Sequence, residues 1–355
     1  MATYTGTTGN DTTLLGGSDD VLLGKEGNDY LDGGAGNNSL VGGLDNNTLL
    51  GGNGDDTLDA YSDIHSSAYH PIRNTITNSL VGGSENDYYI LNSSRDVVVE
   101  SAGLGSGSDT INAWFDYTLP DNVEALYLSS GSNITGNGNS LDNQLDASFA
   151  SSSTLDGWGG NDTICGGVNN FLIGGDGNDS LYGGANNTLL GGNGNDSLDA
   201  YAGLGELWDP RRSTATYSLI GGDGNDYYIL NSSRDVVVEN SGLGSGSDTV
   251  YAWFDYSLTG NVEVLRVDGN FKGWGNSQGN LIEGVNGANS LYGEDGNDTI
   301  LGGVGNDYLD GGNGNDSLVG GNDDDTLDGG AGNDNLDGGL GNDFYIVESS
   351  LDSIS

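Results

Sequence analysis

Hydrophobic residues in the C-terminal part of the chain recur with a period of nine. From Gly284 to Ile346 seven consecutive units read GVNGANSLY, GEDGNDTIL, GGVGNDYLD, GGNGNDSLV, GGNDDDTLD, GGAGNDNLD and GGLGNDFYI, and position 8 of each is Leu, Ile or Tyr. The glycine-rich first half of a unit allows positive φ and a tight reversal. Its last three residues alternate outward, inward and outward, as a short strand does. Each unit therefore predicts one turn and one strand.

Two such units predict one flattened coil, and successive coils predict parallel strands roughly 4.8 Å apart. A single coil cannot bury its own apolar side chains, so a core exists only where neighbouring coils stack. The pattern predicts an all-β fold, a parallel β-roll or β-helix solenoid.

Two weaker arrays repeat the pattern nearer the N-terminus. Between Gly24 and Asp59 the position-6 residues are Asp29, Asn38, Asn47 and Asp56, and Asp11 and Asp20 lie upstream at similar spacing. Between Gly157 and Asp199, nine-residue and eight-residue units alternate. There the carboxylates Asp162, Asp179 and Asp196 are 17 residues apart, and the short units carry Asn170 and Asn187.

A longer duplication surrounds these arrays. DYYILNSSRDVVVE occupies 87–100 and again 226–239, and NDFYIVESSLDSIS at 342–355 resembles its start. Segments 88–153 and 227–283 lack the glycine turn but keep strand-like runs, which predicts continued coils with ion-free turns. For their duplicated aromatics, Trp114, Phe115 and Tyr117 with Trp253, Phe254 and Tyr256, core packing is favoured over a sugar-stacking surface.

The predicted organisation has eight parts and reads as a piece of a longer array. They are a first, partly degenerate array at 1–59; an insertion loop at 60–79; non-consensus β coils at 80–153; a second array at 154–199 with ions on one side; an insertion loop at 200–217; duplicate non-consensus β coils at 218–283; a third array at 284–346; and the start of a further module at 347–355.

Charge decides which partners the chain can have. Of 355 residues 53 are Asp or Glu and only 8 are Lys or Arg, so the formal net charge is −45. Phosphates would be repelled, which excludes nucleic acid as a partner and disfavours an anionic membrane surface. No run approaches the ~18 apolar residues of a membrane helix, so no membrane insertion is expected. The start of the chain has no basic and apolar leader, and the single Cys165 allows no internal disulfide.

Stacked coils would bring the position-6 carboxylates of alternate units together. Carboxylates so close repel one another strongly in a partly desolvated site, and a divalent cation between them reverses the sign of that interaction. Carboxylate and carbonyl oxygens suit Ca²⁺, whereas Mg²⁺ demands a stricter octahedron.

The consensus GGxGxDxUx resembles the RTX (repeats-in-toxin) family, also called haemolysin-type calcium-binding repeats. The resemblance implies a right-handed parallel β-roll with several Ca²⁺ ions, about six or more, in its turns. It also implies that one turn contributes the carbonyls of positions 2 and 4 with its Asp, and that the turn one coil further contributes those of positions 1 and 3 with its own Asp.

In the third array this implies four shared ions. Their ligand sets are Glu294, Gly296 and Asp298 with Gly311, Asn313 and Asp316; Gly303, Gly305 and Asp307 with Gly320, Asn322 and Asp325; Gly312, Gly314 and Asp316 with Gly329, Ala331 and Asp334; and Gly321, Asp323 and Asp325 with Gly338, Leu340 and Asp343.

The other arrays depart from the consensus. In the middle array one row of ions is expected, bridging Asp162, Asp179 and Asp196, with an asparagine-lined, metal-free opposite edge. Its further candidate ligands are Gly160, Gly174, Gly175, Asp176, Gly177, Gly191, Asn193 and Asp226. In the first array Asp29 faces Asn47 and Asn38 faces Asp56, so those sites are expected to be weak or empty, and Asp11 over Asp29 is the better candidate.

The two insertions carry the residues that could hold another ligand. They are His65, His70, Arg73, Arg211 and Arg212. Loops on a rigid scaffold often carry function, although pairing of these arginines with local aspartates is the favoured interpretation.

Two classes of function remain. The favoured one is a secreted, non-catalytic bacterial Ca²⁺-binding module of the extracellular medium or cell surface. The resemblance implies export by type I secretion. The module's role would be structural or adhesive, with a polysaccharide or a cell surface as the partner. The alternative is a calcium-dependent polysaccharide lyase or epimerase, or a carbohydrate-binding module, for which Tyr69, His70 and the loop arginines would be the candidate residues.

Overall fold

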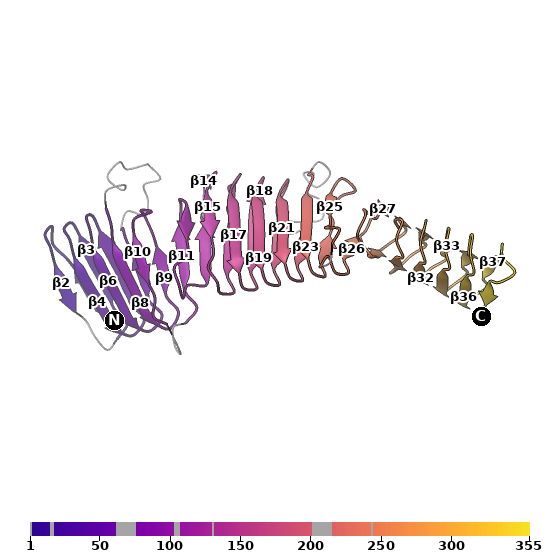
Figure 1. Cartoon of the computed structure of the whole chain (residues 1–355). Coiled ribbons are helices and arrows are strands. Elements are labelled where there is room, and N and C mark those ends of the chain that lie inside the picture. Colours follow the sequence, from indigo (N-terminus) through magenta and orange to yellow (C-terminus); the bar gives the residue numbers. More distant parts are fainter. Residues whose placement is uncertain are drawn as a thin grey trace. The chain divides into compact units, whose positions relative to one another are not determined.

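The computed structural model describes residues 2–14, 18–61, 76–102, 107–129, 131–200, 215–242 and 244–355. The chain forms two units, one ending at Ile173 and the other beginning at Gly174. All regular elements in the described residues are β-strands, and Figure 1 shows them following one another in each unit. No helix in that part of the chain could cross a membrane.

Each coil of the first unit contributes strands to two facing sides. One side holds β1 (Thr3–Thr5), β3 (Val21–Lys25), β5 (Ser39–Gly43), β7 (Thr57–Asp59), β9 (Tyr88–Ile90), β11 (Thr110–Ala113), β13 (Ala125–Leu128), β14 (Gly131–Ser132), β16 (Gln144–Ser151) and β18 (Thr163–Val168). The other holds β2 (Thr12–Leu14), β4 (Tyr30–Ala35), β6 (Thr48–Asn53), β8 (Ser79–Ser84) and β10 (Val97–Val99), followed by β12 (Tyr117–Thr118), β15 (Thr135–Asn137) and β17 (Thr154–Gly159). The strand β19 (Phe171–Asp176) spans the boundary.

The second unit repeats this arrangement. One side holds β20 (Ser180–Gly183), β22 (Ser197–Asp199), β24 (Tyr227–Ile229), β26 (Thr249–Ala252), β28 (Val264–Val267), β30 (Leu281–Gly284), β32 (Thr299–Val304), β34 (Ser317–Asn322), β36 (Asn335–Leu340) and β38 (Ser353–Ile354). The other holds β21 (Thr188–Asn193), β23 (Ser218–Asp223) and β25 (Val236–Val238), followed by β27 (Tyr256–Ser257), β29 (Lys272–Trp274), β31 (Ser290–Tyr292), β33 (Tyr308–Asp310), β35 (Thr326–Asp328) and β37 (Phe344–Ile346).

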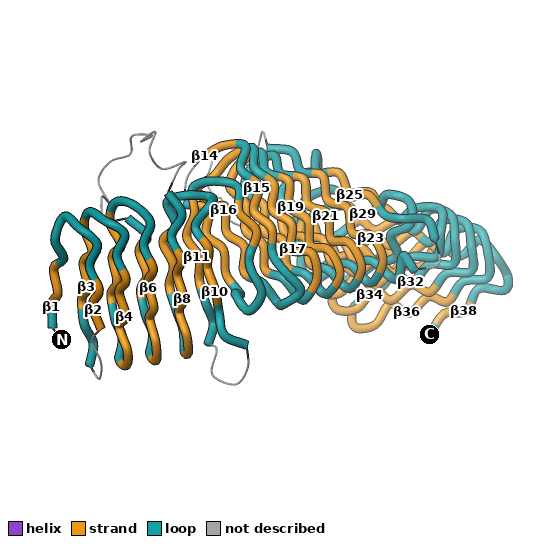
Figure 2. The backbone as a smooth tube through the Cα atoms, turned by 60° about the vertical axis from the view of Figure 1, so that its left-hand side comes forward, coloured by secondary structure: helices purple, strands orange, loops and turns teal. Residues whose placement is uncertain are grey.

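The pairing is parallel, and its register follows the repeat. In the last array Thr299 lies beside Ser317, which lies beside Asn335, so each nonapeptide sits over the unit two further along the chain. Figure 2 shows the resulting succession of coils. The prediction of an all-β parallel β-roll is confirmed.

Two facing columns of side chains, one from each side of the coil, form the core of each stack. The position-8 residues Leu309, Leu318 and Leu327 are completely buried, and so are Leu291, Ile300 and Leu336, whereas Tyr345 of the last unit is partly exposed. Burying a leucine contributes about 1.5–3 kcal/mol, which is gained only when the next coil covers it. Coil stacking and core formation are therefore one event.

The non-consensus segments continue the stack. Strands β9, β11, β13 and β16 pair in register, with Ile111 and Leu126 fully buried in one of the two columns. The duplicated aromatic residues of these segments differ in burial. Tyr256 is buried, as predicted, but Trp114 is 41% exposed, so the prediction of core packing is wrong for that residue. Its side chain faces outward from the coil and contacts solvent.

Candidate metal centre

The position-6 aspartates of the last array form two rows. The backbone N–H of each donates to the Oδ1 of the aspartate one coil further on. The distances are 2.8 Å for Asp298 to Asp316, 2.8 Å for Asp307 to Asp325, 2.9 Å for Asp316 to Asp334 and 3.0 Å for Asp325 to Asp343. The stacking predicted from the nonapeptide is present in both rows, and Asp352 continues one of them by accepting from the N–H of Asp334 at 3.1 Å.

Glycine backbone geometry shapes the turns that hold these carboxylates. Most residues at positions 2 and 4 adopt positive φ, at 96° for Gly303 and 125° for Gly305. The non-glycine residues Glu294, at 73°, and Asp323, at 79°, adopt it too, whereas Val285 and Gly332 do not. A left-handed backbone is a conformation in which glycine carries no steric penalty. The predicted carbonyl ligands at positions 1 to 4 therefore all lie in these turns, next to the aspartates.

One carboxylate oxygen in each site has no donor. The Oδ2 atoms of Asp298, Asp307, Asp316, Asp325 and Asp334 are buried, and none has a hydrogen-bond partner in the described structure. A methyl group on Gly311 would lie 2.5 Å from Oδ2 of Asp316 and 2.5 Å from the carbonyl oxygen of Gly329, one coil away. The glycine leaves open a small space lined by a carboxylate and a carbonyl oxygen. Those oxygens fit Ca²⁺ as ligands.

Burial makes these carboxylates unfavourable as isolated charges. Desolvation, and then the charge of the aspartate one coil away, raises the pKa of Asp298 and of Asp307 from 3.8 to about 7. The same causes raise the pKa of Asp316 and of Asp325 to about 6. An ionised row without a cation is therefore strained at neutral pH, and a cation would relieve that strain.

In the first array, turns with asparagine at position 6 pair the side-chain amide within the turn. The side chain of Asn38 is neutral, and its Nδ2 donates to the carbonyl of Gly36 at 2.8 Å. Nδ2 of Asn47 donates to the carbonyl of Asp45 at 3.3 Å. In both turns the amide reaches the position-4 carbonyl that would be a calcium ligand beside an aspartate.

The first array has the predicted facing pairs. The N–H of Asp29 donates to Oδ1 of Asn47 at 2.9 Å, the N–H of Asn38 to Oδ1 of Asp56 at 2.6 Å, and the N–H of Asp11 to Oδ1 of Asp29 at 2.8 Å. The weakness of the mixed sites and the occupancy of the Asp11 site stay predictions.

The middle row continues in the second unit. The N–H of Asp179 donates to Oδ1 of Asp196, and the N–H of Asp196 to Oδ1 of Asp226, both at 2.8 Å. Asp162 belongs to the first unit, where its Oδ1 accepts from the N–H of Asn143 at 2.7 Å. The ion predicted between Asp162 and Asp179 stays a prediction. Of the candidate ligands in these turns, Gly160, Gly175 and Gly177 have positive φ.

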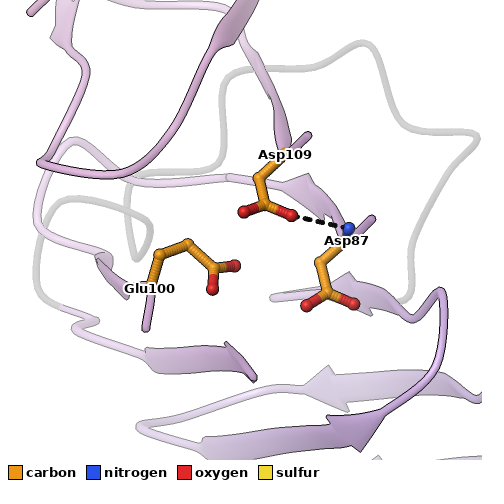
Figure 3. A group of neighbouring side chains, drawn as sticks. All are labelled: Asp87, Glu100 and Asp109. Carbon is orange, nitrogen blue, oxygen red and sulfur yellow. Dashed lines mark hydrogen bonds between the residues drawn. The ribbon is translucent and has the colours of Figure 1, made fainter. Parts of the chain in front are cut away.

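Two clusters of three carboxylates were missed by the sequence reasoning, which assigned only Asp226 among their members. They are Asp87, Glu100 and Asp109, shown in Figure 3, and Asp226, Glu239 and Asp248. In each cluster one carboxylate oxygen from every residue lies within 4.8 Å of those of the other two. Burial raises the pKa of Asp87 and of Asp248 to about 8, and the glutamate of each cluster adds to the shift. The available signal was the exact repetition of the acidic positions in both copies of the duplication.

The candidate loop residues His65, His70, Arg73, Arg211 and Arg212 lie outside the described residues.

Comparison with known proteins gives two findings. The family model of the RTX calcium-binding nonapeptide repeat matches residues 5–40, 32–63, 150–170, 166–198, 185–203, 218–237, 274–309 and 310–345, together more than half of the chain. A stretch of 95 residues, 26% of the chain, is 35% identical to the endo-1,3-1,4-beta-glycanase ExsH of Rhizobium meliloti. The match covers 20% of that protein, so the chain spans about a fifth of the length of this relative.

Proposed function

Because the chain belongs to the RTX calcium-binding nonapeptide repeat family, we propose that it is a secreted Ca²⁺-binding module that folds on meeting extracellular calcium and then serves a structural or adhesive role at a cell surface. Calcium binding follows from the family itself. Secretion, calcium-driven folding and the surface role are the proposal.

The buried, donorless Oδ2 atoms of the aspartate rows carry this proposal. At low Ca²⁺ these carboxylates and the net charge of −45 oppose compaction. When calcium is bound it neutralises the rows, and the binding free energy becomes folding free energy. Extracellular Ca²⁺ sites have dissociation constants of roughly 10⁻⁴–10⁻³ M. Such sites are empty at the low free Ca²⁺ concentration inside a cell and fill at the higher concentration outside.

The test compares the full chain in excess chelator and in millimolar Ca²⁺, by far-ultraviolet circular dichroism and size-exclusion chromatography, with Mg²⁺ as control. We expect an expanded chain with little β structure in chelator and in Mg²⁺, and a compact β-rich chain in Ca²⁺. A chain that stays compact and β-rich in excess chelator would refute calcium-driven folding. Export is tested separately, by comparing the amount of chain in cells and in culture supernatant.

A second candidate function is contact with a polysaccharide. The rings of Trp274 and Tyr292 stack at 5.5 Å with an interplanar angle of 9°. Trp274 also lines an open pocket together with the polar residues Asn276 and Asp295. Aromatic faces beside polar groups suit sugar rings, and the partial relative is a glycanase.

Affinity electrophoresis in a 1,3-1,4-β-glucan gel tests this candidate. We expect the calcium-loaded chain to be retarded and Trp274→Ala to lose that retardation, whereas Phe149→Ala, which removes an exposed aromatic in the other unit, keeps it. Equal mobility of the native chain with and without glucan would remove the candidate.

A further inference from the structure

A glutamate replaces a glycine at one point of the stacked turns. In the regular stack, strands β6 and β8 pair so that Gly52 lies beside Gly83, and position-1 Gly51 faces position-1 Gly82. One coil later, β8 pairs with β10 with Val81 beside Val99, so the residue that faces Gly82 is Glu100. Its carboxylate enters the space where regular coils present a glycine carbonyl.

The aspartates of this turn keep the regular geometry. The N–H of Asp87 donates to Oδ1 of Asp109 at 2.8 Å. Oδ2 of Asp87 and Oδ2 of Asp109 are buried without a partner, and the two residues are only 2% and 0% exposed. Figure 3 shows the Glu100 carboxylate directed toward the space between them. Two donorless oxygens, each more than nine-tenths buried, thus face a third carboxylate.

A tyrosine fixes the position of the glutamate. Position 8 of this unit is Tyr89 instead of leucine, and its fully buried ring ends in a hydroxyl that donates to Oε1 of Glu100. A methyl group on Gly82 would collide with Oδ2 of Asp87, Oε1 of Glu100 and the Tyr89 hydroxyl. Glycine at this position therefore keeps open a pocket surrounded by oxygen atoms.

The duplicated segment of the second unit forms the same arrangement. The N–H of Asp226 donates to Oδ1 of Asp248 at 2.8 Å, and the hydroxyl of Tyr228 donates to Glu239. Oδ2 of Asp226 and of Asp248 are again buried without a partner. Both copies of the duplicated segment therefore keep the same four side chains and the same two buried oxygens without a partner.

We propose that Asp87, Glu100 and Asp109, and likewise Asp226, Glu239 and Asp248, each hold a Ca²⁺ ion, and that these two sites are the tightest in the chain. Glu100 and Glu239 are then calcium ligands outside the nonapeptide motif. Calcium affinity rises with the number of ligand charges and with the rigidity of the site. A regular turn offers two carboxylates, whereas each of these offers three, one of them held by a tyrosine. The proposal revises the expectation of ion-free turns at the first turn of each non-consensus segment.

This inference rests on calcium binding by the chain, and its test uses the full-length protein with Glu100→Gln and Glu239→Gln as separate variants. In each variant the other copy is the internal reference. Isothermal titration with Ca²⁺ is expected to lose one ion of the tightest class, its affinity falling at least tenfold, while the remaining ions bind as before. The matched controls Glu26→Gln and Glu348→Gln remove the same charge from exposed side chains and are expected to change neither count nor affinity.

Terbium(III), a luminescent substitute for Ca²⁺, adds a local readout because a nearby tyrosine excites it. We expect the first two equivalents of terbium to luminesce through Tyr89 and Tyr228, and Tyr89→Phe, which keeps all three carboxylates, to lose about half of that signal. This second variant applies even if a glutamine variant does not fold.

Glutamine variants that fold and bind as many tight ions as the native chain would overturn the inference, as would undiminished terbium luminescence in Tyr89→Phe. If the native chain binds calcium and the variants bind it equally well, the two proposed glutamate sites are refuted but the proposed function is not. A chain that binds calcium and is compact without it refutes the proposed function alone.

Discussion

Turns with aspartate at position 6, as throughout most of the last array, and turns with asparagine there, as at Asn38 and Asn47 of the first array, satisfy their buried polar atoms in opposite ways. In the last array, Oδ2 of Asp307 is buried without a donor. In the first, the equivalent atom is Nδ2 of Asn38, which donates to a carbonyl of its own turn. The aspartate turn leaves a charged oxygen without a donor, as do the turns of Asp29 and Asp56 in the first array, whereas the asparagine turn satisfies its amide internally. We therefore expect the choice of aspartate or asparagine at position 6 to set how strongly a coil depends on calcium.

Removing calcium is expected to separate the two arrays most strongly. When chelator is added to the calcium-loaded chain, strands β32, β34 and β36 should lose backbone protection because their aspartate rows repel. The protection factors of strands β4, β5 and β6 should fall at least about tenfold less, a difference equivalent to about 1.4 kcal/mol. Hydrogen exchange read by mass spectrometry measures both arrays in one sample. Equal loss in the two would break the comparison.

Filling the space beside one aspartate is expected to have the next largest effect. Gly311→Ala places a methyl group 2.5 Å from Oδ2 of Asp316 and from the carbonyl of Gly329, at a backbone conformation that alanine tolerates. The free Ca²⁺ needed for half-maximal folding should rise roughly threefold to tenfold, with one ion fewer bound, because an obstructed site loses about 1 kcal/mol or more.

The control for this change is Gly260→Ala, where an added methyl group meets nothing within 4 Å. The two variants are compared by calcium titration of circular dichroism. A Gly311→Ala protein that titrates like its control would show that the space is not an ion site.

Converting one array toward the other sharpens the comparison. Asn38→Asp places a carboxylate between Asp20 and Asp56 and removes the internal amide donor. In chelator the variant should be less stable by about 1–3 kcal/mol, the cost of a buried polar group without a partner. In Ca²⁺ it should bind at least one more ion, as counted by isothermal titration.

Asn37→Asp is the matched control, since it adds the same charge at the neighbouring exposed position. If both variants bind the same number of ions, the identity of position 6 does not control binding.

The smallest expected effect is on the pH dependence of the metal-free chain. Asp298 and Asp307 have folded-state pKa values raised to about 7, against an ordinary value of 3.8. Between about pH 4 and pH 7 the folded state therefore binds more protons than the unfolded state, and its stability falls as pH rises. In chelator, circular dichroism should show more β structure at pH 5 than at pH 8. A loss of β structure on acidification would contradict the raised pKa values.

Much of the metal centre could be predicted locally because its parts lie within one nonapeptide. Gly303, Gly305 and Asp307 are separated by a few residues, and their roles follow from turn geometry and a period of nine. The pairing of Asp298 with Asp316 also follows, since the array has no interruption. The exposure of Trp114 did not follow, because the burial of an outward-facing side chain depends on the neighbouring strands.

Pairing across an interruption could not be predicted in this way. Asn47 stacks on Asn78, and Asp56 on Asp87, each across 31 residues that include an insertion. No fixed period connects these residues, so their register depends on how the chain re-enters the stack.

The amino-acid sequence by itself determined the repeating turn, the inward leucine and the choice of aspartate or asparagine at each edge, because all three are properties of nine consecutive residues. Only the tertiary structure decided that Glu100 enters the turn of Asp87 and that Tyr89 holds it there. The reason is physical: in a stack of coils the contacts of a side chain are set by the coil above it, and the number of residues between two coils can vary without changing which atoms meet.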